Sequence, residues 1–193
     1  MKTIPVDIKR EVQEKKLTTT LPRLLEPVSM VDSLVTSALQ TSAAKMGRLD
    51  DGAFIALLQQ GDSLACNYYC YNIVRELGEV LGSWSKNIKS VYSCSYDDIT
   101  SGEDFCEKST RFPLIHMIIQ VEQKSKALEA LIAAIDGALV QRHRRMLGPG
   151  QLEHVLDAQV IDDADVRNRA GYAALLNSVY QPPIQVWRSS PNI

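Results

Sequence analysis

The feature that most constrains the fold of this chain is a run of apolar residues, spaced three and four apart, between Leu114 and Met146. A stripe with this spacing lies along one side of an α-helix and packs lengthwise against another helix. Pro113 suits the first turn of such a helix, and Gly148 marks its end. We therefore predict one helix over about 113–147, whose stripe needs a partner surface. The interface residues of this stripe are Leu114, Ile118, Val121, Leu128, Ile132, Ile135 and Leu139.

A second long apolar stripe precedes the first. It predicts a helix over about 50–87, after a shorter helix at 29–46. Gly61, Gly78 and Gly82 weaken this helix, but glycines also let a neighbouring backbone approach closely. Because two long helices would overhang short strands, we expect them to pair as an antiparallel arm. A second copy of the chain, giving a homodimer, or another helical protein would cover the apolar surface that remains.

Three short segments have the residue pattern of β-strands, at 88–96, 155–161 and 184–187. The long helix and a shorter one at about 164–180 separate them. Strands joined by helical crossovers are usually parallel. We therefore predict a helix-dominated α/β fold, in which a small three-stranded parallel sheet carries crossover helices and the long helical arm.

The predicted domain organisation has one globular body. Residues 1–28 lack a sustained period and are broken by prolines, so we expect a partly ordered arm there. Residues 29–188 are long enough to bury one sizeable core, and we assign them to a single α/β domain. Residues 189–193 form a tail.

Composition and charge argue against several classes of protein. The hydrophobic share of 45% and the charged share of 23% are those of a globular domain. A net charge of −2 argues against a dedicated nucleic-acid-binding role, which usually requires a basic surface. No apolar run is long enough to span a bilayer, and the polar start is not that of a signal peptide. We therefore expect a cytoplasmic protein, without a membrane partner, whose thiols stay reduced.

Two pairs of acidic residues are candidates for a catalytic site. Asp97-Asp98 and Asp162-Asp163 each follow a predicted strand, so parallel strands would gather all four carboxylates at one edge of the sheet, where ligands bind. Clustered carboxylates suit Mg²⁺ with a phosphorylated substrate. The segment that follows offers further ligand-binding candidates, which are Arg167, Arg169 and Tyr172. The structural alternative is a helix N-cap in the second pair and a solvated loop at the first.

The four cysteines could together hold a metal. Cys66 and Cys70 lie one turn apart on a predicted helix, and Cys94 and Cys106, or His116, would complete a tetrahedral zinc or iron–sulfur shell. Their separations match none of the tight ligand spacings. A buried core thiol is the more common role of a reduced cysteine. The sequence leaves both alternatives open.

Two functions follow from these patterns. The first is a non-enzymatic protein that associates with itself or binds a partner through the long helical arm. The alternative is a divalent-metal-dependent enzyme that acts on a phosphorylated or nucleotide substrate at the acidic edge of the sheet. No Ser/His/Asp or Cys/His motif is visible along the sequence, although folding can bring such residues together. The sequence alone does not decide whether the chain is an enzyme, or which cofactor it binds.

Overall fold

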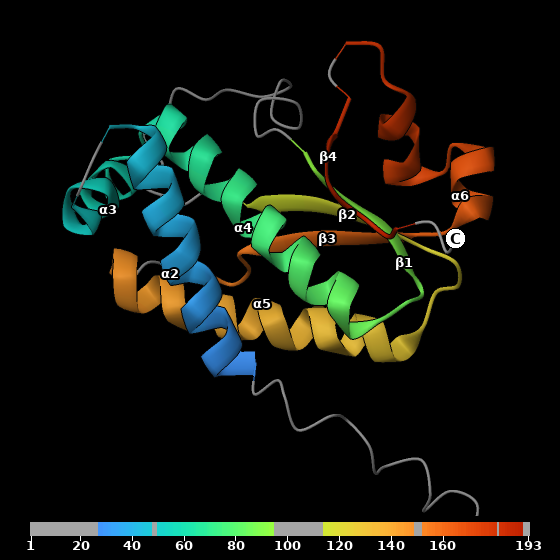
Figure 1. Ribbon diagram of the computed structural model, residues 1–193, viewed down its shortest axis with the longest axis horizontal. Coiled ribbons are helices and arrows are strands. Elements are labelled where there is room, and N and C mark those ends of the chain that lie inside the picture. Colours follow the sequence, from blue (N-terminus) through green and yellow to red (C-terminus); the bar gives the residue numbers. More distant parts are fainter. Residues whose placement is uncertain (1–26, 48–49, 95–113, 149–151, 181, 191–193) are drawn as a thin grey trace, which may run out of the picture.

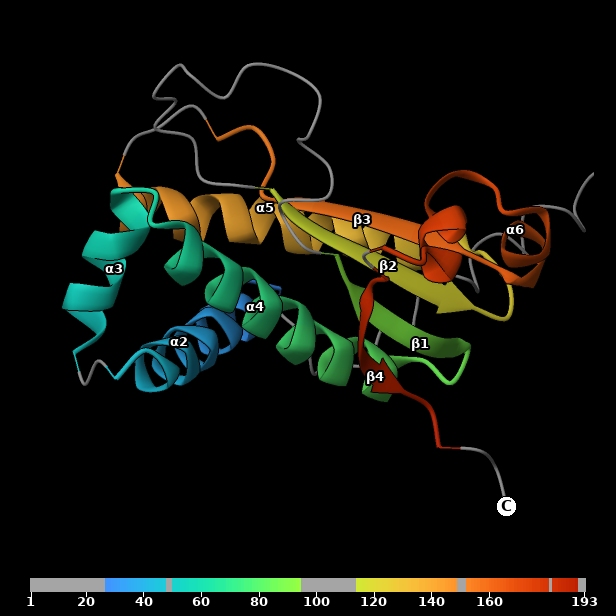
Figure 2. The same cartoon turned by 90° about the horizontal axis from the view of Figure 1, so that it is seen from above.

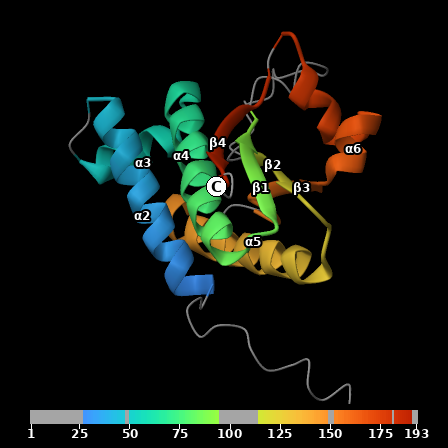
Figure 3. The same cartoon turned by 45° about the vertical axis from the view of Figure 1, so that its right-hand side comes forward.

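The fold is built in layers around one β-sheet, and Figure 1 shows its elements. The computed structural model describes residues 27–47, 50–94, 114–148, 152–180 and 182–190. In chain order the elements are α2 (Pro27–Lys45), α3 (Asp51–Gln59), α4 (Ser63–Trp84), β1 (Ile88–Ser93), β2 (Ile115–Val121), α5 (Lys126–Leu147), β3 (Leu156–Ile161), α6 (Asp163–Asn168), the 3-10 helix η2 (Gly171–Asn177) and β4 (Ile184–Arg188). Helices α4 and α5 cover one face of the sheet, α2 packs against both, and α6 with η2 lies on the other face (Figure 3). The chain thus has the helix-dominated α/β fold that the sequence predicts.

The helix predicted over 50–87 is wrong as one continuous element, because the structure divides it into α3 and α4. Gly61 has a φ of +70°, a left-handed conformation that favours glycine and ends α3. Asp62 then caps α4, since its carboxylate accepts a hydrogen bond from the Ala65 N–H at 2.8 Å. The chain therefore turns between the two helices, and α4 packs against β1 and β4 in place of a projecting arm.

The helix predicted over 113–147 is wrong in its first part, where the structure has strand β2. This segment is apolar at most positions, and so short an apolar run fits a buried strand as well as a helix. Helix α5 begins only after Ser125, whose hydroxyl accepts a hydrogen bond from the Leu128 N–H at 3.3 Å. At 22 residues, α5 spans about 33 Å and lies along β3 (Figure 2). The regular spacing in the sequence therefore covers a strand, a turn and a helix.

Within the described residues the sheet has four strands in the order β3-β2-β1-β4, one more than the sequence predicts. The strands predicted at 88–96, 155–161 and 184–187 correspond to β1, β3 and β4. Only β2 and β3, which α5 connects, are parallel. β1 is antiparallel to both of its neighbours, so the all-parallel arrangement is wrong. The difference arises because β2 pairs with β1 in the place where the sequence predicts a helical crossover.

The helix predicted over about 164–180 is shorter than expected. α6 ends where Arg169 adopts a left-handed conformation with a φ of +51°, and the chain continues as η2. These two elements cover a second, smaller apolar cluster on the face of the sheet away from α4 and α5. The buried members of this cluster are Cys94, Ile118, Ile161 and Ala173.

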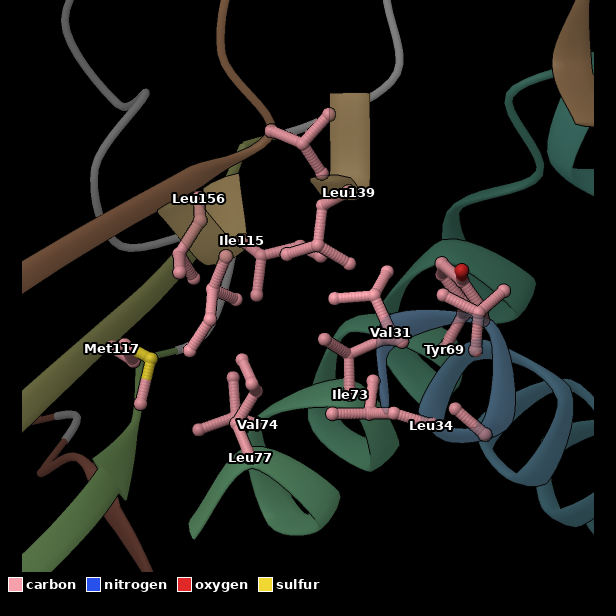
Figure 4. Packing of buried hydrophobic residues seen from close by; sticks show 14 of the residues in the cluster. Val31, Leu34, Tyr69, Ile73, Val74, Leu77, Ile115, Met117, Leu139 and Leu156 are labelled. Carbon is pink, nitrogen blue, oxygen red and sulfur yellow. The ribbon is translucent and has the colours of Figure 1, made fainter. Parts of the chain in front are cut away.

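The main core lies between the sheet and helices α2, α4 and α5. Figure 4 shows the side chains that gather there from five elements, among them Leu34 of α2, Ile73 of α4, Ile115 of β2, Leu139 of α5 and Leu156 of β3. Full burial of one such side chain contributes about 1.5–3 kcal/mol, so this core fixes the sheet against the helices.

Two glycines on α4 let β4 approach the helix closely. A Cβ atom added at Gly82 would lie 2.1 Å from the Cζ2 atom of Trp187, and one at Gly78 would lie 2.9 Å from the Trp187 Cβ atom. A residue with a side chain would therefore displace Trp187 from α4. The sequence predicts that a neighbouring backbone approaches these glycines, whereas the atoms that come closest to Gly78 and Gly82 belong to side chains, chiefly Trp187.

Candidate functional site

Three side chains stand in one row across the sheet, one just after β1 and the others in β2 and β3, and we call Cys94, His116 and Asp157 the thiol row. The register pairs Ser93 with Met117, and one residue further on the Cys94 N–H donates to the His116 carbonyl oxygen at 3.1 Å. The parallel register places His116 opposite Asp157. Because directly opposed residues point to the same face of a sheet, all three side chains lie on the face that α6 and η2 cover. Cβ atoms of opposed antiparallel residues are about 5 Å apart, so the register makes the Cys94 and His116 side chains direct neighbours.

Hydrogen bonds to Asp157 fix the orientation of the His116 ring. The Asp157 Oδ2 atom lies 2.9 Å from His116 Nδ1 and accepts the Tyr172 hydroxyl at 2.8 Å. The Gln159 amide donates to the other carboxylate oxygen at 2.9 Å. An ionised carboxylate can only accept, so Nδ1 of His116 donates its hydrogen bond. The Nε2 atom is then the ring nitrogen that can accept a proton from a thiol.

The charge state of Asp157 follows from the same contacts. Burial alone would raise the pKa of the Asp157 carboxyl, but the hydrogen bonds from Gln159, Tyr172 and His116 outweigh it and hold that pKa below its usual value. Burial, with the hydrogen bond to Asp157, raises the pKa of the Tyr172 hydroxyl to about 12. At neutral pH the row therefore contains an ionised carboxylate with a neutral phenol beside it, and Tyr172 acts as a hydrogen-bond donor.

Cys94 links the thiol row to an apolar cleft of about 390 Å³. Its side chain is 8% exposed and packs in the smaller apolar cluster, while the residue also lines the cleft. The cleft lies where one face of α4 meets the ends of β1, β2 and β4. The described residues that line it are Lys45, Leu64, Asn67, Tyr68, Cys70, Tyr71, Ser93, Cys94, Leu114 and Ile184. Cys94 follows the end of β1, so this residue meets the cleft at the end of the strand although its side chain packs on the face of the sheet away from α4.

The second acidic pair predicted from the sequence has structural partners. Asp162 is the N-cap of α6, and its carboxylate accepts the Ala164 N–H at 2.9 Å. Asp163 forms an ion pair with the Lys89 ammonium at 2.6 Å and accepts the Gln120 amide at 3.2 Å. These hydrogen bonds hold the pKa of the Asp163 carboxyl below its usual value. The structural alternative considered for this pair accounts for the Asp162 position.

The other members of the predicted acidic site are placed apart from one another. Asp97 and Asp98 lie outside the described residues, so their part in a metal site stays a prediction. Arg167 lies in α6, close enough to help lower the pKa of the Asp163 carboxyl, and Arg169 is the left-handed residue that ends α6. Tyr172 belongs instead to the thiol row through its hydrogen bond to Asp157.

The structure brings two of the four predicted cysteine ligands, Cys70 and Cys94, to the lining of the same cleft. Cys66 and Cys70 lie in α4, whereas Cys94 follows β1, and Cys106 lies outside the described residues. Burial, with a smaller contribution from the Asp62 charge, raises the pKa of the Cys66 thiol to about 11. Burial also raises the pKa of the Cys70 thiol. Among the described residues, no group of three or more His, Cys, Asp or Glu side chains is arranged to hold a metal ion.

Most of the apolar residues predicted to form a helical interface pack inside this chain. Ile132 is partly buried against the main core, and Leu114 is 40% exposed beside the cleft. At most 1% of the residue surface is exposed at Ile118, Val121, Leu128, Ile135 and Leu139. The stripe that predicted a partner surface therefore finds its partners within the same chain.

In the sequence analysis His116 is only an alternative metal ligand beside the cysteines, and Asp157 has no predicted role. The signal that could have found them is the single ionisable residue within the apolar segment Ile115–Val121. A strand assignment for that segment would have placed His116 on a definite face of the sheet.

Comparisons with known proteins add no functional information. No family model matches the chain, and neither a curated protein nor a solved structure matches it. In the part of the chain that the structure describes, none of the helices combines the length and the apolar character needed to cross a membrane. The thiol row and the cleft are therefore the features that indicate a function.

Proposed function

We propose that this chain is an enzyme that uses Cys94 as a nucleophile in acyl transfer from a carbonyl substrate. The observation that carries the proposal is the thiol row, in which the thiol stands opposite an imidazole whose Nδ1 atom is bound by a carboxylate. A nucleophile, a base and an orienting carboxylate in this order recur in hydrolases on unrelated folds. The function is therefore inferred from the geometry of these three residues and not from the fold of the chain.

The proposed reaction has two halves. First, Nε2 of His116 takes the proton of the Cys94 thiol while Sγ forms a bond to the substrate carbonyl carbon. The leaving group departs with its bonding electron pair and takes that proton from His116, which leaves a thioester on Cys94. Then His116 takes a proton from water, whose oxygen attacks the thioester carbonyl. The acid is released, and the proton returns to the Cys94 sulfur.

Asp157 is a positioning residue in this mechanism, because it contacts His116 and not the substrate. Its hydrogen bond keeps the proton on Nδ1, so that Nε2 faces the reaction as a base. Tyr172 and Gln159 hold the carboxylate from its other sides. A positioned general base contributes about 10²–10⁴-fold to a rate. Because the base works only in the correct tautomer and orientation, loss of the orienting carboxylate can remove most of this factor.

The test is covalent labelling with 4-nitrophenyl acetate, followed by peptide mass mapping of every cysteine. We expect the acetyl group on Cys94, and we expect both His116→Asn and Asp157→Asn to slow its attachment at least about tenfold. Cys66 and Cys70 serve as internal controls, because their raised pKa values keep these thiols protonated at neutral pH.

A matched control variant is His154→Asn. His154 also binds an aspartate through Nδ1, at 2.7 Å from Asp136, but it lies outside the thiol row. Each variant is also followed across pH, because loss of the base changes how the labelling rate depends on pH, and circular dichroism at each pH shows whether the variant is still folded. Labelling of Cys66 as fast as Cys94, or a Cys94 rate that His116→Asn leaves unchanged, would overturn the proposal.

The two functions predicted from the sequence, self-association and a metal-dependent reaction, stay predictions. Self-association relied on an apolar stripe that packs within the chain. The metal-dependent reaction relied on four clustered carboxylates, of which Asp162 caps α6 and Asp163 pairs with Lys89. We therefore propose cysteine chemistry ahead of both.

A further inference from the structure

We infer that the apolar cleft beside Cys94 binds the substrate. This substrate is an acyl compound with an apolar body. It carries one negative charge, at the end remote from the reacting carbonyl. The inference rests on the proposed function for the reaction and adds the class of substrate. Three features of the cleft carry it: its apolar walls, its charge, and the presence of Cys94 in its lining.

The walls of the cleft expose apolar side chains from three separate elements. Leu64 of α4, Leu114 before β2 and Ile184 of β4 are 57%, 40% and 55% exposed. Tyr68 and Tyr71 add half-buried aromatic rings from the same face of α4. Large apolar side chains are rarely left exposed together without a partner, and a concave group of them is typical of a ligand site. The apolar part of a ligand would cover these residues.

The positive charge in the cleft favours a ligand with an anionic group at the end away from the reacting carbonyl. Lys45 is the charged residue among the described lining residues, and its ammonium lies 5.5 Å from the centroid of the Tyr71 ring. This cation–π contact holds the positive charge at the wall of the cleft. An anionic group would therefore be attracted to Lys45, and no carboxylate among the described lining residues opposes it.

Together these features fix the direction of the substrate. Cys94 follows β1, Lys45 is the last residue of α2, and both residues line the same cleft. An acyl group that reacts at Cys94 would lie along the apolar side chains and place its distal charge at Lys45. Asn67 and Ser93 add hydrogen-bonding groups to the described lining of the cleft.

The experiment measures binding of octanoate and of 1-octanol by ligand-observed NMR. The protein carries Cys94→Ala, so that binding is measured without covalent chemistry. We expect octanoate to bind, and Lys45→Met to weaken it about three- to fivefold while 1-octanol is unaffected. Leu64→Glu, at an exposed position, should weaken both ligands. Lys86→Met is the matched control, because Lys86 lines a different cleft and its loss should change neither ligand.

The outcomes separate this inference from the proposed function. If neither Lys45→Met nor Leu64→Glu changes the binding of octanoate, the ligand lies elsewhere and the inference is overturned. The absence of octanoate binding would overturn it as well. In the protein with Cys94 intact, octanoate should also slow alkylation of Cys94 by iodoacetamide at least about threefold. If Cys94 fails to acylate but octanoate still binds through Lys45, the proposed reaction fails and the binding site stands.

Discussion

The contact between α4 and β4 gives a stability prediction that the structure makes quantitative. Gly82 lies inside α4 beneath the Trp187 ring, and we choose the substitution Gly82→Ala. The matched control is Gly137→Ala in α5, where an added Cβ meets no atom within 4 Å. Both positions are inside α-helices of 22 residues, so the two substitutions differ mainly in what the new methyl group touches.

The expected magnitudes follow from two opposing effects. Replacing Gly by Ala inside an open helix stabilises it by about 1 kcal/mol, and we expect this gain for Gly137→Ala. At Gly82 the new Cβ would lie 2.1 Å from Cζ2 of Trp187, whereas carbon atoms in contact lie about 3.5–4 Å apart. Such overpacking costs about 1–3 kcal/mol. The two variants should therefore differ by about 1–3 kcal/mol, with Gly82→Ala the less stable.

The assay is urea unfolding followed by far-UV circular dichroism, with thermal melts as a second measure. One kcal/mol corresponds to about 2–4 °C in Tm for a chain of this size. The decisive variant is Gly82→Ala combined with Trp187→Ala, which removes the ring. In the Trp187→Ala background, Gly82→Ala should become as stabilising as Gly137→Ala.

Two results would refute this reasoning. If Gly82→Ala matches Gly137→Ala in stability, Trp187 does not occupy the space above the glycine. If Gly82→Ala remains destabilising after Trp187→Ala, the cost arises from another contact of α4, and the close approach of β4 is not its cause.

Two further predictions concern buried polar groups. Burial is the main cause that lowers the pKa of His143 to about 4, below the value of about 6.5 expected in the unfolded chain. As the pH drops from about 6.5 to 4, the unfolded chain takes up a proton at His143 before the folded protein does, so the free energy of unfolding falls. His143→Gln keeps an acceptor for the Tyr69 hydroxyl but removes the imidazole. In urea unfolding, this variant should lose about 3 kcal/mol less stability over that pH range than the parent protein does. Stability-against-pH curves that run parallel in the two proteins would contradict the assignment. Asp136 accepts the buried N–H groups of Val155 and Leu156, both at 2.9 Å. Asp136→Ala should cost about 2–4 kcal/mol in chemical unfolding and Asp136→Asn less, and equal losses would contradict this role.

The fold was predictable where local residue chemistry decides the structure. The alternation of residues in 88–93 identifies a strand before any tertiary contact is considered. Asp50 is the N-cap of α3, since its carboxylate accepts the Gly52 and Ala53 N–H groups, and an Asp just before a helix is a local signal of this kind. The fold was not predictable at β2, because a short apolar run supports a helix and a strand equally. Because of that single error, the prediction lacks strand β2 and gives β1 the wrong direction. It also extends the 22-residue helix α5 into a projecting arm.

The thiol row shows why the site was harder to predict than the fold. Cys94, His116 and Asp157 lie far apart along the chain, and only the strand order and register bring them together. A slip of one residue between β1 and β2 would turn Cys94 to the opposite face from His116. What prevents the slip is the burial of Val91 and Ile119, which oppose each other on the face that packs against the helices. The residues that build the main core therefore also set the chemistry on the other face, although none of them belongs to the site.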